Sequence, residues 1–142
     1  MSAEGTRQNR CWVCGPDHPE GLHVRWEGVR PVNARLVVPA RYQGFTGVAH
    51  GGTIAAILDD GMWHAVWHQF KLDAATVELR VRYRQPVLVG EPVVIDAWAD
   101  TPVHRVVPAR ATLADPGGRL LVEARGRFMV GTSMHQMGPG GL

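Results

Sequence analysis

Residues 51–70 restrict the fold of this chain more than any other segment. They are good helix formers without the alternation of a β-strand, and the helix they predict is apolar nearly all round. A helix of that kind is buried instead of lying on a surface. Its apolar members are Ile54, Ala55, Ala56, Ile57, Leu58, Met62, Trp63, Ala65, Val66 and Trp67. The rest of the chain must therefore cover one central helix.

The remaining apolar residues alternate with polar ones, as in half-buried strands. We expect strands over residues 22–26 and 34–38, which form a hairpin, and over 76–86, 92–100 and 105–129, the last folded back at residues 115–118. Within 76–86, one predicted face carries Val77, Leu79, Val81 and Tyr83, and the other carries Glu78, Arg80, Arg82 and Arg84. The sequence thus predicts an α+β fold in which a curved antiparallel β-sheet wraps around one long helix.

The length and composition predict one globular domain. The chain has 142 residues, of which 45% are hydrophobic, and this is enough for a single core. Residues 1–21 are polar and rich in Gly and Pro, which predicts an N-terminal cap or tail that carries a Cys-x-x-Cys pair. Residues 22–130 hold the domain, and the Gly-rich residues 131–142 are expected to form a flexible tail.

The charge pattern limits the partners. The formal net charge is only +2, and the basic residues are scattered among the acids, so we expect no nucleic-acid partner. The N-terminus lacks the apolar core of a secretory signal, and no apolar run reaches the roughly 18 residues that a membrane span requires. We therefore expect a cytoplasmic protein without a membrane partner.

Several short motifs together carry a family resemblance. They are Cys11-Trp12-Val13-Cys14-Gly15, Gly21-Leu22, Tyr42-Gln43-Gly44, Gly47-Val48-Ala49-His50-Gly51-Gly52, Leu58-Asp59-Asp60 and Tyr83-Arg84-Gln85-Pro86. With these motifs, about residues 11–130 resemble the hotdog-fold acyl-CoA thioesterases of the phenylacetate-pathway type, which include the 4-hydroxybenzoyl-CoA thioesterase branch that uses a helix carboxylate. The resemblance implies hydrolysis of an acyl-CoA thioester without a cofactor, by an assembly that is at least a dimer.

The start of the predicted helix is a candidate oxyanion site. A helix N-terminus offers unpaired backbone N–H groups and the positive end of the helix dipole. Gly51 and Gly52 have no side chains, so a thioester carbonyl can approach these donors, each of which stabilises a developing oxyanion by about 3 kcal/mol. The alternative interpretation is that the two glycines only permit a tight turn.

A carboxylate within the apolar helix is the second candidate element. Burying it costs several kcal/mol, so its retention points to a function as nucleophile or general base. Asp59 lies nine residues after His50, the offset at which the resembling enzymes carry their catalytic acid, so we assign the chemistry to Asp59. Asp60, about 100° further round the helix, is assigned with Gly52 and Thr76 to substrate binding, and a salt-bridged or solvent-facing role is its alternative.

One helix cannot hold both elements of the site. Gly51 and Asp59 are eight residues apart, which is about 12 Å along a helix, whereas the reacting carbon must lie about 3 Å from both the donor and the nucleophile. Two antiparallel helices from two subunits can meet this condition. We therefore expect a homodimer with two shared sites, and two dimers could pair further into a tetramer.

Three residues have supporting roles with open alternatives. Gln43 lies in the loop before the motif, where the resembling enzymes often carry an amide that orients the substrate carbonyl or a water, but here it could instead cap a turn. His50 could contact the thioester or shape the turn through a backbone hydrogen bond. Thr76 lies where the strand after the helix could bring its hydroxyl near the acid of the partner subunit.

We expect no metal in the site. His64 and His68 lie four residues apart on the predicted helix but have no third ligand nearby, which favours packing roles. Cys11 and Cys14 are followed by His18 and His23, but their spacing differs from that of a zinc finger. We interpret the Cys pair as a turn that packs over the mouth of the pocket.

The arginines of the predicted strands have two possible roles. CoA phosphates could pair with some of them, although a solvated sheet face explains most. They are Arg80, Arg82, Arg84, Arg105, Arg110, Arg125 and Arg127.

The leading function is hydrolysis of an acyl-CoA. The alternatives are a non-catalytic hotdog protein that binds an acyl thioester, for which Asp59 is dispensable, and a hotdog dehydratase or hydratase, which requires a differently placed His base.

Overall fold

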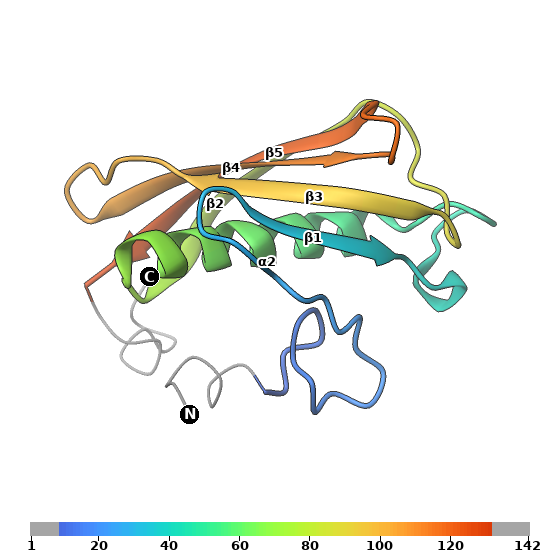
Figure 1. Ribbon diagram of the computed structural model, residues 1–142, viewed down its shortest axis with the longest axis horizontal. Helices are drawn as coiled ribbons and strands as arrows, with labels where there is room; N and C mark the ends of the chain where they lie inside the picture. Colours follow the sequence, from blue (N-terminus) through green and yellow to red (C-terminus); the bar gives the residue numbers. More distant parts are fainter. Residues whose placement is uncertain (1–8, 132–142) are drawn as a thin grey trace.

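The computed structural model describes residues 9–131 and consists of one helix held in a curved sheet (Figure 1). The elements are β1 (Val32–Val37), a 3-10 turn η1 (Ala40–Tyr42), α2 (Gly51–Phe70), β2 (Ala74–Tyr83), β3 (Pro92–Ala99), β4 (Val106–Ala114) and β5 (Leu120–Val130). The fold class, the helix and the later strands are as predicted. Among the described helices, none is long and apolar enough to cross a membrane.

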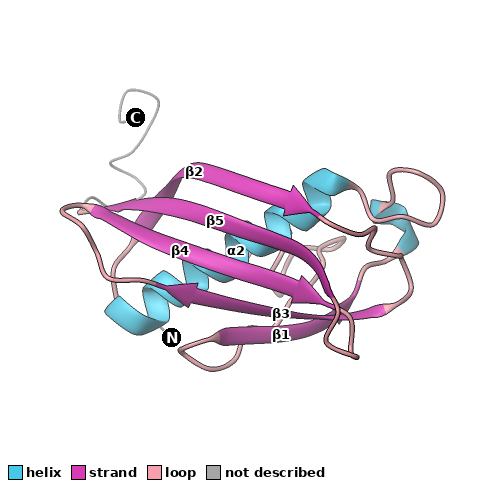
Figure 2. Cartoon of the chain, turned by 90° about the horizontal axis from the view of Figure 1, so that it is seen from above, coloured by secondary structure: helices cyan, strands magenta, loops and turns pink. Residues whose placement is uncertain are grey.

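The five strands form one antiparallel sheet in the order β1-β3-β4-β5-β2, so β1 and β2 are its edges (Figure 2). The helix side of the sheet is lined at its centre by small residues that face one another across neighbouring strands. They are Ala97, Ala99, Ala109, Ala111, Ala124 and Gly126. A Cβ at Gly126 would lie 2.8 Å from the Phe128 side chain and 3.2 Å from Met62, so the absent side chain allows this close packing.

The apolar helix is buried as its composition requires. Ile57, Leu58, Met62, Ala65 and Val66 have no exposed surface, and they fill the space against the inner face of the sheet. Burial of each large side chain stabilises the fold by about 1.5 to 3 kcal/mol. The helix ends at Phe70 and is capped by Lys71, which adopts a left-handed conformation (φ 55°). The Lys71 backbone N–H donates to the Trp67 carbonyl.

A β-bulge changes which side chains of β2 face the helix. The register against β5 shifts between Thr76 and Glu78, so Thr76 opposes the buried Phe128 while Leu79 opposes Gly126. Opposed residues in an antiparallel pair point to the same face. Thr76 and Leu79 therefore both face the helix, and Val77, which was predicted to share the face of Leu79, lies in the bulge between them.

The strand predicted over residues 22–26 is not formed. His23 adopts a positive φ of 53°, which breaks the extended conformation. Only an isolated bridge between Glu27 and Asn33 remains of the predicted hairpin. The segment instead lies against the loop that carries Cys11 and Cys14, called the Cys loop below. The Leu22 N–H donates to Trp12 O of this loop (2.8 Å).

The N-terminal segment lies on the side of α2 that faces away from the sheet (Figure 1). In the described part of this segment, Val13 and Val24 are buried in the common core. Residues 1–8 of the predicted cap and residues 132–142 of the predicted tail lie outside the described residues.

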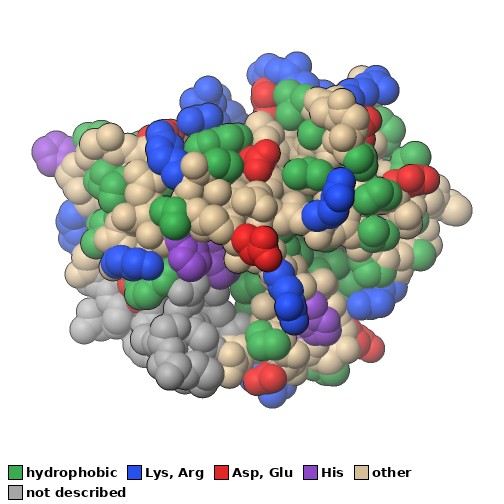
Figure 3. Space-filling view, in the orientation of Figure 1, with side chains coloured by type: hydrophobic (Ala, Val, Ile, Leu, Met, Phe, Trp, Pro, Cys, Tyr) green, Lys and Arg blue, Asp and Glu red, His purple; other side chains and the backbone are tan. Residues whose placement is uncertain are grey.

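The outer face of the sheet carries the arginines. Lys and Arg side chains project along the upper rim in Figure 3, over the strands. Several pair with acids or rings of the sheet: Arg84 with Glu123 at 2.8 Å, Arg127 with Glu78 at 3.5 Å, and Arg110 over the ring of Trp98 at 4.6 Å. These pairs agree with a solvated sheet face.

Candidate functional site

The start of α2 presents a backbone donor toward an open depression. His50 is the N-cap residue, and its Nδ1 accepts a hydrogen bond from the Gly52 N–H at 2.9 Å. Within residues 9–131, no group accepts a hydrogen bond from the Gly51 N–H. Of the two glycine amides, the one at Gly51 therefore remains available to a ligand.

The surroundings of Gly51 leave room for a ligand. The atoms nearest to a Cβ at Gly51 would be those of the Tyr83 side chain, at an ordinary contact distance of 3.5 Å. The Tyr83 hydroxyl donates to Gly51 O at 2.6 Å and ties the end of β2 to the first turn of the helix. A depression of about 340 Å³ adjoins this point, lined mainly by Phe45, Ile54, Tyr83, Arg84 and Pro86. Phe45 is 86% exposed beside it, so this region offers apolar contact surface.

Gln43 and His50 both shape the turn before the helix. The Gln43 side-chain Oε1 accepts from the Gly47 N–H at 2.9 Å, and Gly47 itself has a φ of +82°, which favours glycine. The His50 N–H donates to Tyr42 O at 2.9 Å while its ring caps the helix. For both residues the structure shows the turn-forming alternative that the sequence left open.

Asp59 lies half-buried on the face of α2 that meets β2. Its Oδ1 accepts a hydrogen bond from the Thr76 hydroxyl at 2.7 Å, a contact that the bulge in β2 makes possible. Burial raises the pKa of the Asp59 carboxyl above its usual value, and the Thr76 hydrogen bond acts in the opposite direction. Thr76 was predicted near the acid of a partner subunit, but in this chain it contacts Asp59 of the same chain.

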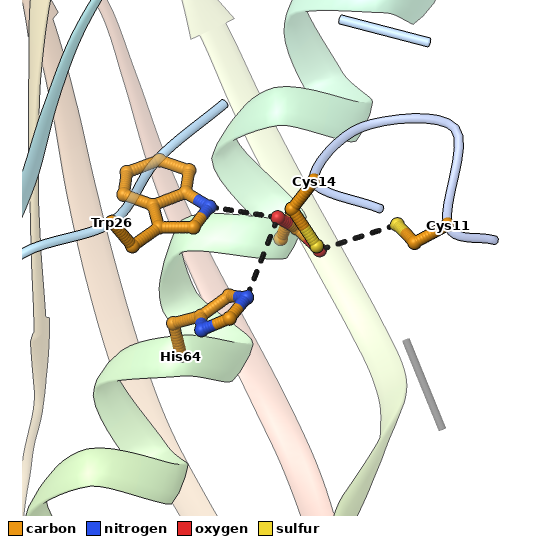
Figure 4. A network of polar contacts seen from close by, with 5 residues as sticks. Cys11, Cys14, Trp26 and His64 are labelled. Carbon is orange, nitrogen blue, oxygen red and sulfur yellow. Dashed lines mark hydrogen bonds and ion pairs between the residues drawn. The ribbon is translucent and has the colours of Figure 1, made fainter. Parts of the chain in front are cut away.

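Asp60 faces a different way, into contact with the N-terminal segment. Trp26 Nε1 donates to its Oδ2 at 2.8 Å, and the thiols of Cys14 and Cys11 lie 3.4 and 3.7 Å from its Oδ1. His64 Nε2 lies 3.7 Å from Oδ2. Figure 4 shows the Trp26, His64, Cys14 and Cys11 side chains converging from three parts of the chain.

Burial dominates the electrostatics around Asp60. It raises the pKa of Asp60 to about 7, with a further contribution from the Cys11 charge, and it lowers the pKa of His64 to about 4. The hydrogen bond from Cys14 lowers the pKa of Cys11 to about 5, while the pKa of Cys14 is raised. The Asp60 carboxylate is thus in contact with Trp26 and the Cys loop of the N-terminal segment. These contacts do not favour its predicted role in substrate binding.

Two residues at these sites were missed by the sequence reasoning. Tyr83 was predicted only as an inward strand residue, although it belongs to the motif Tyr83-Arg84-Gln85-Pro86 that carried the family resemblance. Trp26 was placed in a strand, and no local pattern indicates that its indole reaches a carboxylate 34 positions away. The Cys loop was predicted over the pocket mouth, whereas the structure places it against Asp60.

Comparisons with known proteins agree with this architecture. The model of the thioesterase superfamily matches residues 46–101, which include the His50-Gly51-Gly52 turn and all of α2, β2 and β3. No curated protein matches the sequence. A crystallised thioesterase superfamily protein is 24% identical with a TM-score of 0.77, and the match covers 83% of this chain and 62% of that one, so the chain spans less than two thirds of its length.

Two further solved structures match this chain over most of their own length. Zebra fish thioesterase superfamily member 2 is 19% identical over 88% of this chain and 94% of its own, with a TM-score of 0.74. A hypothetical thioesterase from Streptococcus pneumoniae TIGR4, solved with coenzyme A, is 18% identical over 78% and 87%, with a TM-score of 0.71. Residues 46–101 thus match the thioesterase superfamily model, and the architecture shared with these structures is the hotdog fold that the sequence predicted.

Proposed function

We propose that the protein hydrolyses an acyl-CoA thioester at a site shared by two subunits. The observation that carries the proposal is the half-buried Asp59 held by Thr76, on the same helix whose first amide, at Gly51, has no acceptor among the described residues. One group is a basic carboxylate and the other an oxyanion donor, and these are the two parts that thioester hydrolysis requires.

The reaction follows from these two groups. The Gly51 N–H polarises the thioester carbonyl and stabilises the oxyanion that forms on its oxygen. Asp59 either attacks the carbonyl carbon, giving an anhydride that water then hydrolyses, or removes a proton from a water that attacks directly. In both cases the C–S bond breaks, the thiolate of CoA leaves, and the products are the free acid and CoA.

The second subunit is proposed from the exposed edge strand β2. Leu79 and Tyr83 are 37% and 50% exposed although they lie on the helix side of the sheet. An edge strand with exposed apolar side chains is a surface that pairs with another chain. A two-fold axis beside β2 would set two α2 helices antiparallel, with Gly51 of one near Asp59 of the other.

The matched structures support an acyl-CoA substrate and the Asp–Thr pair. The pneumococcal protein binds coenzyme A, and two further forms of it were solved with an alanine in place of an aspartate and of a threonine, respectively. An Asp and a Thr were thus of interest in a protein of the same fold. In this chain we propose that Asp59 and Thr76 form the corresponding pair.

A test of the shared site uses two inactive variants. Gly51→Pro removes the N–H at the first helical position, where proline is tolerated, and the preceding His50 already has the extended conformation (ψ 135°) that proline favours. Gly51→Ala, which keeps the N–H, is the matched control. We expect Gly51→Pro and Asp59→Asn each to lose hydrolysis of a panel of acyl-CoAs, measured by thiol release.

Mixing the two variants distinguishes a shared site from a site within one chain. After co-refolding or subunit exchange, half of the dimers are heterodimers, and each contains one site with both functional groups intact. We expect about a quarter of the wild-type activity to return. No recovery in a mixture shown by mass spectrometry to contain heterodimers would contradict the shared site. Wild-type protein that binds acyl-CoA but releases no thiol would favour the non-catalytic alternative.

A further inference from the structure

Four potential metal ligands meet on the side of α2 that is opposite the sheet. They come from two places: Cys11 and Cys14 from the N-terminal loop, and Asp60 and His64 from successive turns of the helix (Figure 4). The donor atoms of Cys11, Cys14 and Asp60 all lie within 4.8 Å of one another. His64 extends the group, since its Nε2 is 3.7 Å from Asp60 Oδ2.

The distances from the two sulfurs to Asp60 Oδ1 suit a small tetrahedral ion, with His64 next to the other carboxylate oxygen. Zinc binds thiolate sulfur at about 2.3 Å and nitrogen or oxygen at about 2.0 to 2.2 Å, so neighbouring ligands of a tetrahedral site lie about 3.3 to 3.8 Å apart. The Cys14 and Cys11 sulfurs lie 3.4 and 3.7 Å from Asp60 Oδ1, within that range. Soft thiolates together with an imidazole and a carboxylate favour zinc over magnesium or calcium.

The backbone of the Cys loop is built to bring both sulfurs to the same side. The Gly15 N–H donates to Cys11 O at 2.7 Å, which closes a tight turn around the pair. A Cβ at Gly15 would lie 2.4 Å from the backbone N of Cys11, so only glycine fits there. The Val24 N–H donates to Val13 O at 2.9 Å and holds the loop against the next segment of the chain.

The acidic groups around Asp60 also favour a bound cation. Two thiols and a carboxylate lie together in a largely buried place, and among residues 9–131 the ion-pair contact of Asp60 is with His64, with no Lys or Arg in reach. A buried carboxylate is costly unless a positive charge or a metal compensates it. Trp26 Nε1 donates to Asp60 Oδ2 and fixes the carboxylate, in the way that outer hydrogen bonds orient metal ligands.

From this geometry we propose that Cys11, Cys14, Asp60 and His64 bind a structural zinc ion that fastens the N-terminal loop to α2. Four protein ligands complete the tetrahedron and leave no open position, so the ion has no direct part in the hydrolysis. The site replaces our sequence interpretation of the Cys pair as a turn over the pocket. It does not depend on the proposed function, because Asp59 lies on another face of the helix and contacts Thr76 instead.

The test measures metal in the full chain expressed with zinc supplementation and desalted. We expect about one zinc per chain by inductively coupled plasma mass spectrometry, and at least a tenfold lower content in Cys14→Ser and Asp60→Asn. His18→Ala is the matched control, because His18 lies in the same loop outside the cluster, and it is expected to keep its zinc. Asp59→Asn is expected to keep zinc while losing hydrolysis, which separates this proposal from the proposed function.

A second measurement avoids variants that fail to fold. Titrating the folded wild type with an organomercurial should release zinc into a colorimetric indicator in step with modification of its two cysteines. Cobalt substitution should add the near-ultraviolet thiolate-to-metal band of a tetrahedral site, and Cys14→Ser should lack it. Wild type without bound metal, zinc content unchanged in Cys14→Ser, or a Cys11–Cys14 disulfide in freshly prepared, alkylated protein would each overturn the proposal.

Discussion

Asp59 and Asp60 are adjacent on one helix, yet they meet different parts of the molecule. Asp59 faces β2 at the open edge of the sheet, where Thr76 is its hydrogen-bond partner among the described residues. Asp60 faces the N-terminal segment, where Trp26 and two thiols contact its carboxylate. One acid keeps an oxygen available beside an exposed surface, while the other has both oxygens engaged.

From this difference we expect the segment packed against each carboxylate to decide its role. Successive helical residues are about 100° apart, so neighbouring acids must project to different partners. A bulge in β2 provides a single donor to Asp59, which leaves it able to act as a base. A Cys loop and an indole surround Asp60, which makes it an anchoring residue.

The largest expected effect comes from exchanging each acid for its amide. Asp59→Asn should lower kcat for thioester hydrolysis by about 10² to 10⁴, because the amide cannot accept a proton or attack the carbonyl. Asp60→Asn, measured in the same thiol-release assay, should lower kcat by less than about tenfold. Equal losses in two well-folded variants would show that the comparison of the two acids is wrong.

The stability of Asp60→Asn should depend on zinc. In the zinc-loaded state, we expect the substitution to lower the free energy of unfolding by about 3 kcal/mol, because a ligand of the bound ion is lost. In chelated protein the effect should be small or reversed, since wild type then holds a largely buried carboxylate whose ion-pair contact among the described residues is His64 alone. Denaturant melts with and without chelator measure this. The same loss in both conditions would exclude metal as its cause.

Trp26→Phe tests the surroundings of Asp60 with a smaller change. Phenylalanine keeps an aromatic ring against Gly61 but removes the Nε1–H that donates to Asp60, at an expected cost of about 1 to 3 kcal/mol in the free energy of unfolding. The kcat for hydrolysis should stay within about twofold of wild type, because this contact involves Asp60 and lies on another face of α2 from the Asp59–Thr76 pair. Thermal melts and the thiol-release assay check the two expectations together.

The sequence predicted the helix, the sheet and the catalytic candidate because their signals are local. The apolar run of α2, the alternation in β3 to β5 and the glycines before the helix are each visible within about 20 residues. The strand over 22–26 failed because alternation alone cannot show that His23 takes a positive φ. Segments with identical patterns can pair with different partners.

The surroundings of the two acids could not be predicted because they depend on long-range packing. Cys11 lies 49 positions from Asp60, and Trp26 lies 34 positions from it, so no spacing rule brings them together. Likewise, Thr76 reaches Asp59 only because of the bulge, which changes the face that its side chain occupies. The family motif predicts different roles for the two acids from their offset from His50, and only the tertiary contacts show how their surroundings differ.

The hydroxyl of Thr76 should set the pH range in which Asp59 works. Burial raises the pKa of Asp59, and the hydrogen bond from Thr76 lowers it because the donor stabilises the ionised form. Hydrolysis that uses the carboxylate is therefore lost as pH falls through this raised pKa. Thr76→Val removes the donor at similar volume, so the acidic limb of kcat/KM should move to higher pH, and kcat at the plateau should fall by less than about tenfold.

Thr76→Ser keeps the hydroxyl and should restore the wild-type profile, which distinguishes an electrostatic role from a packing role. The side chain of Asp60 has no contact with Thr76 among the described residues, so zinc content should be the same in all three proteins. An acidic limb that stays in place in Thr76→Val would mean that another group controls the reaction. The functional difference between the two adjacent acids would then rest on something other than the partner that β2 presents to Asp59.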